Sequence, residues 1–312
     1  MIPADGLVLI DKSQSLTSQQ VVSRVKKQLG VKKAGHGGTL DPMATGLLVL
    51  GLGRGTRLLG YLAGQDKRYQ ATIRLGQATN TDDAEGEPLG DAVDATGLSE
   101  DEIIAAMKAY VGVIEQVPCS VSAIKVDGKR SYALVRQGQR VDLKSRTVTV
   151  HGFELNQRLD NSPWVDLNVG VQCSSGTYVR ALARDLGKDL GVGAHLTALR
   201  RTQIGKLDVN QAVSLEKVSH TDVQDLATMA LLVAPGVEVD AEMARQVSFG
   251  ASIEMDLPFE MAAIFYKSQI LGLYRPDPGR PGWARSTVVL VDSISAVRPD
   301  TMTDLIMDEG TT

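Results

Sequence analysis

Strand signals and helix signals interleave along this chain, and they do so without a fixed repeat length. Residues 6–11 form a short apolar run that is typical of a buried strand, and residues 46–53 form another. Between them, residues 17–30 predict a helix with a Thr–Gln capping box at its start and a glycine at its end. Because no repeat period is present, a solenoid is disfavoured. We expect an α/β chain of the α+β kind, with a mixed sheet and flanking helices.

Two later segments alternate between apolar and polar residues, as the strands of a half-buried sheet do. Residues 69–75 place Tyr69 and the following odd-numbered residues on one face, and residues 164–173 repeat the pattern. Tyr69 stands at the start of its strand, where side chains often face a cleft. Residues 178–187 predict a helix that ends at Gly187.

The length of 312 residues is enough for one sizeable core and a smaller unit. The pattern of predicted elements changes near residue 234, after which the sequence predicts short strands and a hairpin. We therefore expect a catalytic domain over residues 1–233 and a small β-rich domain over residues 234–312. Residues 236–312 hold twelve acidic against six basic residues, so the second unit is not an obvious phosphate binder.

Basic residues are segregated, although the formal net charge of the chain is -4. Residues 1–60 carry eight Lys and Arg against three Asp, and residues 121–150 carry seven against two. Residues 81–110 carry nine acidic residues and a single lysine. Local positive potential of this kind suits a phosphate-rich partner, but ordinary solvated faces explain it equally well.

Several classes of protein are disfavoured by what the sequence contains. No apolar run approaches the roughly 18 residues that span a bilayer, so we expect a cytoplasmic protein with no membrane partner. The two cysteines, Cys119 and Cys173, have no spacing typical of a zinc ribbon and are expected to be free thiols. The four histidines form no spaced ligand set with acids, so no metal is expected.

The segment "AGHGGTLDPMATGLL" raises the question of what Asp41 does. An Asp–Pro pair is a common helix start, with Asp as the N-cap and Pro in the first turn, and taken alone this is the simpler reading. A reactive carboxylate is the alternative. The surrounding glycines match neither a Walker loop nor a dinucleotide fingerprint, and tight turns are their more ordinary use.

Four collinear segments carry a resemblance to a known family. They are "KKAGHGGTLDPMATGLL", "DKRYQATIRLG", "SAIKVDGKRSYALVRQG" and "CSSGTYVRALARDLG", the last followed by "GAHLTALRR". Together they resemble the bacterial tRNA pseudouridine synthase B family over roughly residues 6–206. The resemblance implies a mixed, largely antiparallel sheet with a central cleft, and a C-terminal PUA-like RNA-binding domain. It also implies isomerisation of the tRNA T-loop uridine at the conventional position 55, without metal or cofactor.

The resemblance implies three catalytic residues. Asp41 would be the catalytic carboxylate, Arg180 would pair with it, and Tyr69 would pack against the target uracil. A carboxylate suits a reaction that detaches and rejoins a base, because it can attack or stabilise an electron-poor centre. Whether it adds to C6 of the ring, bonds to C1′ or removes a sugar proton is left open.

The resemblance further implies substrate-binding residues. Tyr178 and Leu199 would line the base pocket, and His36 would contact the RNA near the flipped nucleotide. The partner would be the T arm of tRNA, bound by a monomer, with the basic tract 125–146 closing over it. One departure is visible: the family commonly has Asp-Lys-Pro-x-Gly near its start, whereas residues 11–15 read Asp-Lys-Ser-Gln-Ser.

Two other functions are compatible with the residues themselves. An RNA chaperone could fold tRNA through the same basic surface without catalysis, and a nucleotide-binding protein could use the glycine-rich turns. Retained tRNA binding with loss of product in an Asp41→Asn variant would separate the enzyme from the chaperone.

Overall fold

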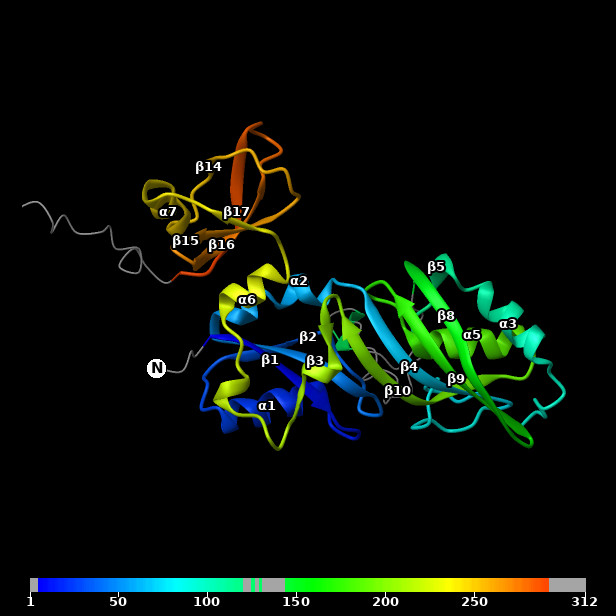
Figure 1. Cartoon of the computed structure of the whole chain (residues 1–312). Helices are drawn as coiled ribbons and strands as arrows, with labels where there is room; N and C mark the ends of the chain where they lie inside the picture. Colours follow the sequence, from blue (N-terminus) through cyan, green and yellow to red (C-terminus); the bar gives the residue numbers. More distant parts are fainter. Residues whose placement is uncertain (1–4, 120–124, 127–128, 131–143, 292–312) are drawn as a thin grey trace, which may run out of the picture.

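The computed structural model describes residues 5–119, 125–126, 129–130 and 144–291. A large sheet flanked by helices fills most of the molecule, and a smaller five-stranded sheet lies beyond one end of it (Figure 1). Most of the basic tract 125–146 lies outside the described residues. Within it, β6 (Lys125–Val126) and β7 (Lys129–Arg130) pair with each other.

The large sheet is mixed and largely antiparallel, as expected. Among the described residues, seven of its nine strand pairings are antiparallel, and the β1–β12 and β3–β10 pairings are parallel. Its strands lie in the order β12 (Val213–Ser214), β1 (Gly6–Lys12), β3 (Thr45–Leu52), β10 (Ala194–Ile204), β4 (Lys67–Leu75), β9 (Trp164–Cys173), β8 (Arg146–Asn161) and β5 (Gly112–Gln116), with β2 (Ala34–Gly37) on β3 and β11 (Leu207–Asp208) on β10.

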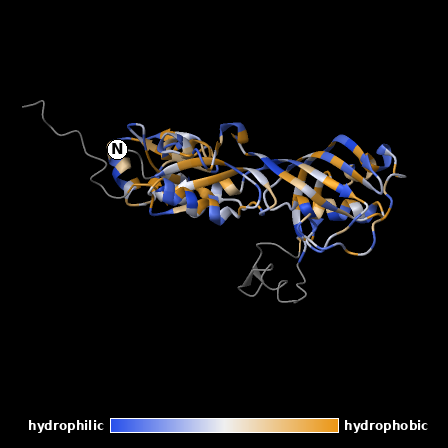
Figure 2. Cartoon of the chain, turned by 90° about the horizontal axis from the view of Figure 1, so that it is seen from below, coloured by the Kyte–Doolittle hydropathy of each residue, from blue (hydrophilic) through white to orange (hydrophobic). Residues whose placement is uncertain are grey.

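Three helices cover one face of this sheet and enclose the main hydrophobic core. They are α1 (Ser18–Gln28), α3 (Glu100–Lys108) and α5 (Val179–Asp189). Helix α1 begins with the predicted capping box between Thr17 and Gln20, and it buries Val21, Val22 and Val25. Apolar and polar residues alternate along the strands (Figure 2) because only one face of the sheet meets these helices.

Strand β4 shows how the two faces differ. Tyr69, Ala71 and Ile73 are buried in the core, whereas Gln70 and Thr72 point to the other side. In the half of the sheet made by β4, β9 and β8, that other side carries polar side chains, and we call it the polar face. The predicted alternation of residues 69–75 is therefore confirmed.

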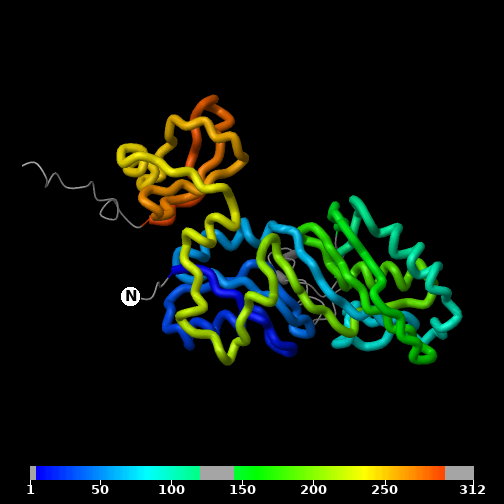
Figure 3. Tube along the Cα trace, in the orientation of Figure 1, coloured from blue at the N-terminus to red at the C-terminus, as the bar shows by residue number. Residues whose placement is uncertain are grey.

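The chain returns to the N-terminal strand after β10 (Figure 3). Residue Leu7 pairs with Gln224, and β12 lies beside β1. The short helices α2 (Leu59–Ala63) and α6 (Leu226–Leu231) contribute to a second apolar cluster, which lies on the opposite side of β1 and β3 from α1.

The C-terminal unit is a small β-rich body, as expected. It consists of β13 (Gly236–Glu238), α7 (Ala241–Ser248), β14 (Ile253–Glu254), β15 (Ala262–Tyr266), β16 (Gln269–Pro276) and β17 (Trp283–Val289). The predicted hairpin is formed by β15 and β16. Phe265 and Leu273 of this unit share the second apolar cluster with Leu47 and Leu59 of the large unit. The boundary placed between residues 233 and 234 stays a prediction.

One predicted helix end is wrong. Helix α5 continues past Gly187 and ends at Asp189, with Leu190 as its C-cap. Glycine is needed at position 187 for packing instead, because an added Cβ atom would lie 2.3 Å from the backbone nitrogen of Ala194. The glycine therefore lets β10 approach the helix closely and does not terminate it.

The departure at residues 11–15 has a visible consequence for the turn. Ser15 has a φ of 72°, a backbone conformation that favours glycine, and its backbone N–H donates to the carbonyl oxygen of Pro42 at 2.8 Å. We expect Ser15→Gly to stabilise the protein by about 1 kcal/mol, because it removes the Cβ penalty of the left-handed conformation. Thermal unfolding should show a rise of about 2–4 °C. Ser13→Gly, in the same turn but without a positive φ, should instead lower the melting temperature.

Candidate active site

Asp41 lies in a turn between β2 and β3, and the interpretation of Asp41-Pro42 as a helix start is wrong. Residues 41–44 form a turn closed by a 3.1 Å hydrogen bond from the N–H of Ala44 to the carbonyl oxygen of Asp41, and strand β3 follows at once. A helix cannot begin there because the chain enters the sheet within four residues. Asp41 is thus free to use its carboxylate elsewhere.

Three buried side chains form hydrogen bonds with the backbone in and around this turn. The Ser18 hydroxyl, at the start of α1, accepts from the N–H of Leu40 at 2.9 Å and donates to its carbonyl oxygen at 3.0 Å. Lys12 Nζ donates to the carbonyl oxygen of Pro42 at 3.3 Å. The ends of β1 and α1 therefore fix the backbone on both sides of Asp41.

Arg201 is the third side chain, and sequence reasoning missed it. The residue is 1% exposed, and its guanidinium donates to the carbonyl oxygens of Gly38, at 3.0 Å, and Leu47, at 2.8 Å. Its backbone passes so close to β3 that a Cβ atom on Gly46 would lie 2.2 Å from the Arg201 carbonyl oxygen, and Gly46 has a φ of +96°. Only glycine fits there, which explains the "ATGLL" part of the motif.

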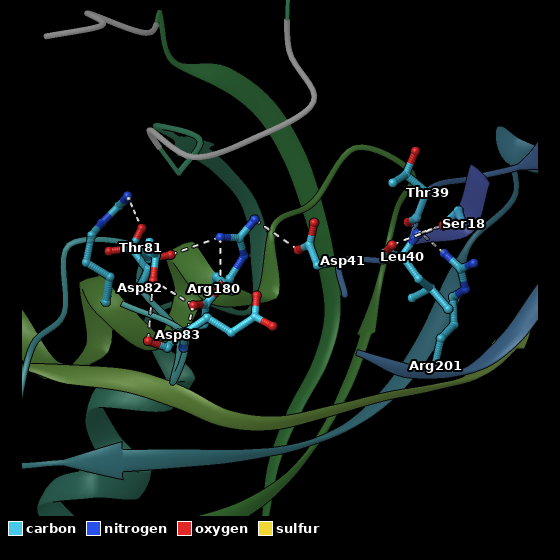
Figure 4. A network of polar contacts seen from close by, with 11 residues as sticks. Ser18, Thr39, Leu40, Asp41, Thr81, Asp82, Asp83, Arg180 and Arg201 are labelled. Atoms are coloured by element: carbon cyan, nitrogen blue, oxygen red, sulfur yellow. Dashed lines mark hydrogen bonds and ion pairs between the residues drawn. The ribbon is translucent and has the colours of Figure 1, made fainter. Parts of the chain in front are cut away.

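Asp41 forms the predicted ion pair with Arg180 (Figure 4). Arg180 Nη2 lies 2.9 Å from Asp41 Oδ2; the side chain of Arg180 is 4% exposed and that of Asp41 is 36% exposed. Arg180 is the second residue of α5, so the helix carries its guanidinium rigidly. Burial opposes the charge of Arg180, but the neighbouring carboxylates, Asp41 foremost, raise its pKa above the ordinary value.

A second carboxylate, that of Asp83, forms an ion pair with the other terminal nitrogen of the same guanidinium. Arg180 Nη1 lies 3.0 Å from Asp83 Oδ2 and donates to the carbonyl oxygen of Thr81 at 2.9 Å. The Thr81 hydroxyl in turn donates to Asp83 Oδ1 at 2.6 Å. Next to it, Arg184 Nη1 lies 3.3 Å from Asp82, whose carboxyl has a pKa raised by burial.

These acids belong to the strongly acidic stretch 81–110, which gave no sequence signal for a site. In sequence they resemble a solvated charged loop. They become buried only because the loop folds against α5. Their pairing with the arginines of that helix is therefore a long-range contact, which local sequence does not indicate.

Tyr69 and Leu199 lie side by side on the helix-covered face of the sheet. Leu199 pairs with Ala71 and Arg201 pairs with Tyr69 across β10 and β4, so the four side chains occupy adjacent positions on one face. Tyr69 is 9% exposed and Leu199 is 8% exposed. Burial raises the pKa of the Tyr69 phenol, and the Arg201 guanidinium hydrogen-bonds to it. The phenol therefore stays protonated at neutral pH.

Tyr178 and His36 approach from two further elements. Tyr178 is the N-cap residue of α5, where its backbone N–H and carbonyl bond the Gln116 side chain at 2.8 and 3.1 Å. The Arg146 guanidinium lies 5.3 Å from the centroid of its ring. His36 comes from β2, opposite Leu50 of β3, and is partly exposed. The roles expected for these two residues stay predictions.

Lys12, which contacts the turn, is expected to make the free energy of unfolding depend on pH. Burial lowers its pKa from 10.5 to about 8. Between these values the unfolded chain keeps a proton that the folded chain has released, so this group makes the free energy of unfolding rise with pH, by at most about 1.4 kcal/mol per pH unit. We expect Lys12→Met to lose that slope in urea unfolding measured from about pH 8 to about pH 10.

A second lysine serves as the comparison for this prediction. Burial lowers the pKa of Lys67 to about 8 as well, and its Nζ donates to the carbonyl oxygens of Ala63 and Gln65. Lys67→Met should therefore lose a similar slope. A Lys12→Met protein with the full wild-type slope would show that Lys12 keeps its proton in the folded state.

Comparison with known proteins assigns the family. The model of the TruB family pseudouridylate synthase (N terminal domain) matches residues 26–179, and that of the tRNA pseudouridylate synthase B C-terminal domain matches residues 180–232. A tRNA pseudouridine synthase B from Cutibacterium acnes (strain DSM 16379 / KPA171202) is 47% identical over 291 residues, which cover 92% of this chain and 98% of that protein. This chain belongs to the TruB family of pseudouridylate synthases. It is therefore an RNA-modifying isomerase by family, as expected.

Further relatives agree with this membership. The tRNA pseudouridine synthase B of Rhodococcus jostii (strain RHA1) is 52% identical over 252 residues, which cover 80% of this chain and 82% of that protein. A chain in a crystal structure of a Cbf5-Nop10-Gar1 complex is 26% identical, with a TM-score of 0.64, and the match covers 86% of this chain and 78% of that one. The expected fold class is thereby confirmed.

None of the helices in the described residues is long and apolar enough to cross a membrane. No group of three or more His, Cys, Asp or Glu side chains in the same part of the chain could hold a metal ion.

Proposed function

We propose that this member of the family converts the T-loop uridine of tRNA at the conventional position 55 to pseudouridine, with Asp41 as the catalytic carboxylate. The observation that supports this most is the ion pair between half-exposed Asp41 and buried Arg180. Arg180 engages Oδ2 and restrains the carboxylate, which leaves Oδ1 to meet a substrate. The names of the relatives, tRNA pseudouridine synthase B, support tRNA as the substrate.

The reaction needs a carboxylate held in place and little else. The N1–C1′ bond of the uridine breaks, the base turns, and a C5–C1′ bond forms, while C5 loses a proton and N1 gains one. The atoms balance without an oxidant or a reductant. Asp41 would attack or stabilise the electron-poor sugar or ring carbon. The positive charge of Arg180 would stabilise the ionised carboxylate of Asp41 before and after that step.

Tyr69 and Leu199 would hold the detached base. The uridine of a folded T loop is stacked, so its extrusion costs a few kcal/mol that stacking in the enzyme must offset. Tyr69 offers an aromatic face, and its protonated hydroxyl can take part in exchange of the C5 proton. Leu199, its neighbour on the same face, would supply an apolar wall, with Tyr178 and His36 contacting the base and the RNA.

The proposal also covers the part of the tRNA that is bound, the oligomeric state and the location of the enzyme. The enzyme would bind the T arm as a monomer, in the cytoplasm.

One experiment tests this function directly. Purified protein is incubated with an unmodified tRNA transcript, and pseudouridine is mapped position by position. We expect a single product in the T loop. Binding of the transcript without any product would support the chaperone alternative, and a product confined to another arm would overturn the proposed specificity.

A further inference from the structure

A cavity of about 530 Å³ lies behind the floor of the candidate active site, on the polar face of the sheet. Gln70 and Thr72 line it, and they alternate along β4 with Tyr69 and Ala71, which belong to the buried core. The cavity and the Asp41–Arg180 pair are therefore on opposite sides of the same strands. Polar side chains from the other strands and loops complete its lining: Gln14, Thr45, Asn156 and Asn168.

Two strands of the sheet are irregular beside this cavity. Strand β10 shifts register between Leu196 and Ala198, and β8 shifts between Leu155 and Gln157. Such β-bulges bend a strand and are frequent beside functional sites. Both bulges contribute lining residues, Thr197 from β10 and Asn156 from β8.

Gly170 keeps room open next to this cavity. It pairs with Gln70 across β9 and β4, and an added Cβ atom would first meet Asn156 Nδ2, at 3.7 Å, an ordinary contact distance. A larger side chain at position 170 would therefore extend toward Gln70 and Asn156 without a backbone clash. The position offers a way to fill the space by substitution.

The charge within the cavity is balanced. The cation that lines it, Arg200, binds both carboxylate oxygens of Asp11, at 2.9 and 2.8 Å. This pairing makes the cavity a poor site for a phosphate, which would have to compete with Asp11. The other polar groups of the lining are amides and hydroxyls, which carry donors and acceptors close together.

One of the lining amides is held in a defined orientation. Asn168 accepts from the Thr72 hydroxyl at 2.9 Å and donates to Gln157 Oε1 at 3.2 Å. Ala198 adds exposed apolar surface, whereas the side chains of Met43 and Val169 belong to the buried core. A site with several amides and hydroxyls, one amide held in a fixed orientation, and a paired cation matches a flat, uncharged ligand that has donors and acceptors along its edge. Asn and Gln side chains pair with nucleobase edges in this manner.

We propose that this cavity binds an uncharged nucleobase, separately from the uridine that is modified. The base could belong to a free nucleoside or to an unpaired nucleotide of an RNA. Because Met43 and Thr45 follow Asp41 closely in the chain, a base bound here contacts the segment that carries the carboxylate from behind. The two sites thus share one stretch of backbone.

The side-chain amides themselves report on the ligand. In an ¹⁵N–¹H correlation spectrum, titration with adenosine should shift the NH₂ signals of Gln14, Gln70 and Asn156 along a saturating curve. Ribose 5-phosphate, which lacks a base, should leave them unchanged. Signals that move linearly without saturation, or that respond equally to ribose 5-phosphate, would overturn the proposal.

Two variants locate the binding. Gly170→Leu should abolish the saturable shifts, whereas the matched change Gln172→Leu, on the same strand and face but outside this cavity, should preserve them. Should Gly170→Leu not fold, Gln70→Ala serves instead, with an expected loss of about tenfold in affinity from one hydrogen-bonded edge. Unchanged adenosine binding in the folded Gly170→Leu or Gln70→Ala protein would contradict this location.

The two sources of the base are distinguished by a second titration. A short single-stranded oligoadenylate that shifts the same amide signals would identify an RNA nucleotide as a ligand. A response to adenosine alone would identify a free nucleoside. If neither compound produces saturable shifts, no nucleobase binds there. Pseudouridine formation is not the readout, so failure of this inference is separate from failure of the proposed function.

Discussion

Replacement of Asp41 with asparagine is expected to abolish pseudouridine formation while tRNA binding stays nearly unchanged. The amide keeps the size of the carboxylate and can still accept a hydrogen bond from Arg180, but it is neither a nucleophile nor a base at neutral pH. Loss of a reactive group of this kind lowers turnover by about 10⁴-fold or more. Single-turnover conversion of a tRNA transcript and a filter-binding assay measure the two quantities.

A matched control makes the effect specific to the site. Asp160 is also paired with an arginine, Arg158, at 2.8 Å, and it lies on β8 with 57% of its side chain exposed. Asp160→Asn makes the same chemical change and should leave turnover within about twofold, because an exposed pair contributes little. Equal turnover in the Asp41 and Asp160 variants would contradict the catalytic assignment of Asp41.

Local signals in the sequence account for much of the fold. The capping box at Thr17 and the strict alternation of residues 69–75 are statements about neighbouring residues, and the structure confirms both. The helix end predicted at Gly187 is wrong because glycine serves two purposes. It can end a helix, or it can let a strand approach a helix, and only the position of β10 distinguishes them.

The candidate site was only partly accessible from the sequence. The Asp41–Arg180 pair came from the resemblance, and the N-cap interpretation of Asp41, which the residues alone favoured, is wrong. Sequence spacing could not show Asp83 or Arg201 as parts of the site. Asp83 and Arg180 are separated by 97 positions in the sequence, and Arg201 and Gly38 by 163 positions. Contacts of that range depend on the packing of the whole sheet, which no local pattern encodes.

Removal of the Arg180 guanidinium is expected to be the most destabilising of these changes, at about 3–5 kcal/mol, because it leaves the Asp83 carboxylate buried without its cation. Arg180→Met combined with Asp83→Asn should recover most of that loss in urea unfolding, since the stranded charge is gone. Neither protein should form pseudouridine, because Asp41 has lost its partner. The pair Arg200–Asp11, whose side chains are 38% and 35% exposed, should cost about 1 kcal/mol or less when changed in the same two ways. An Arg180→Met protein no less stable than Arg200→Met would mean that water, rather than Arg180, stabilises Asp83.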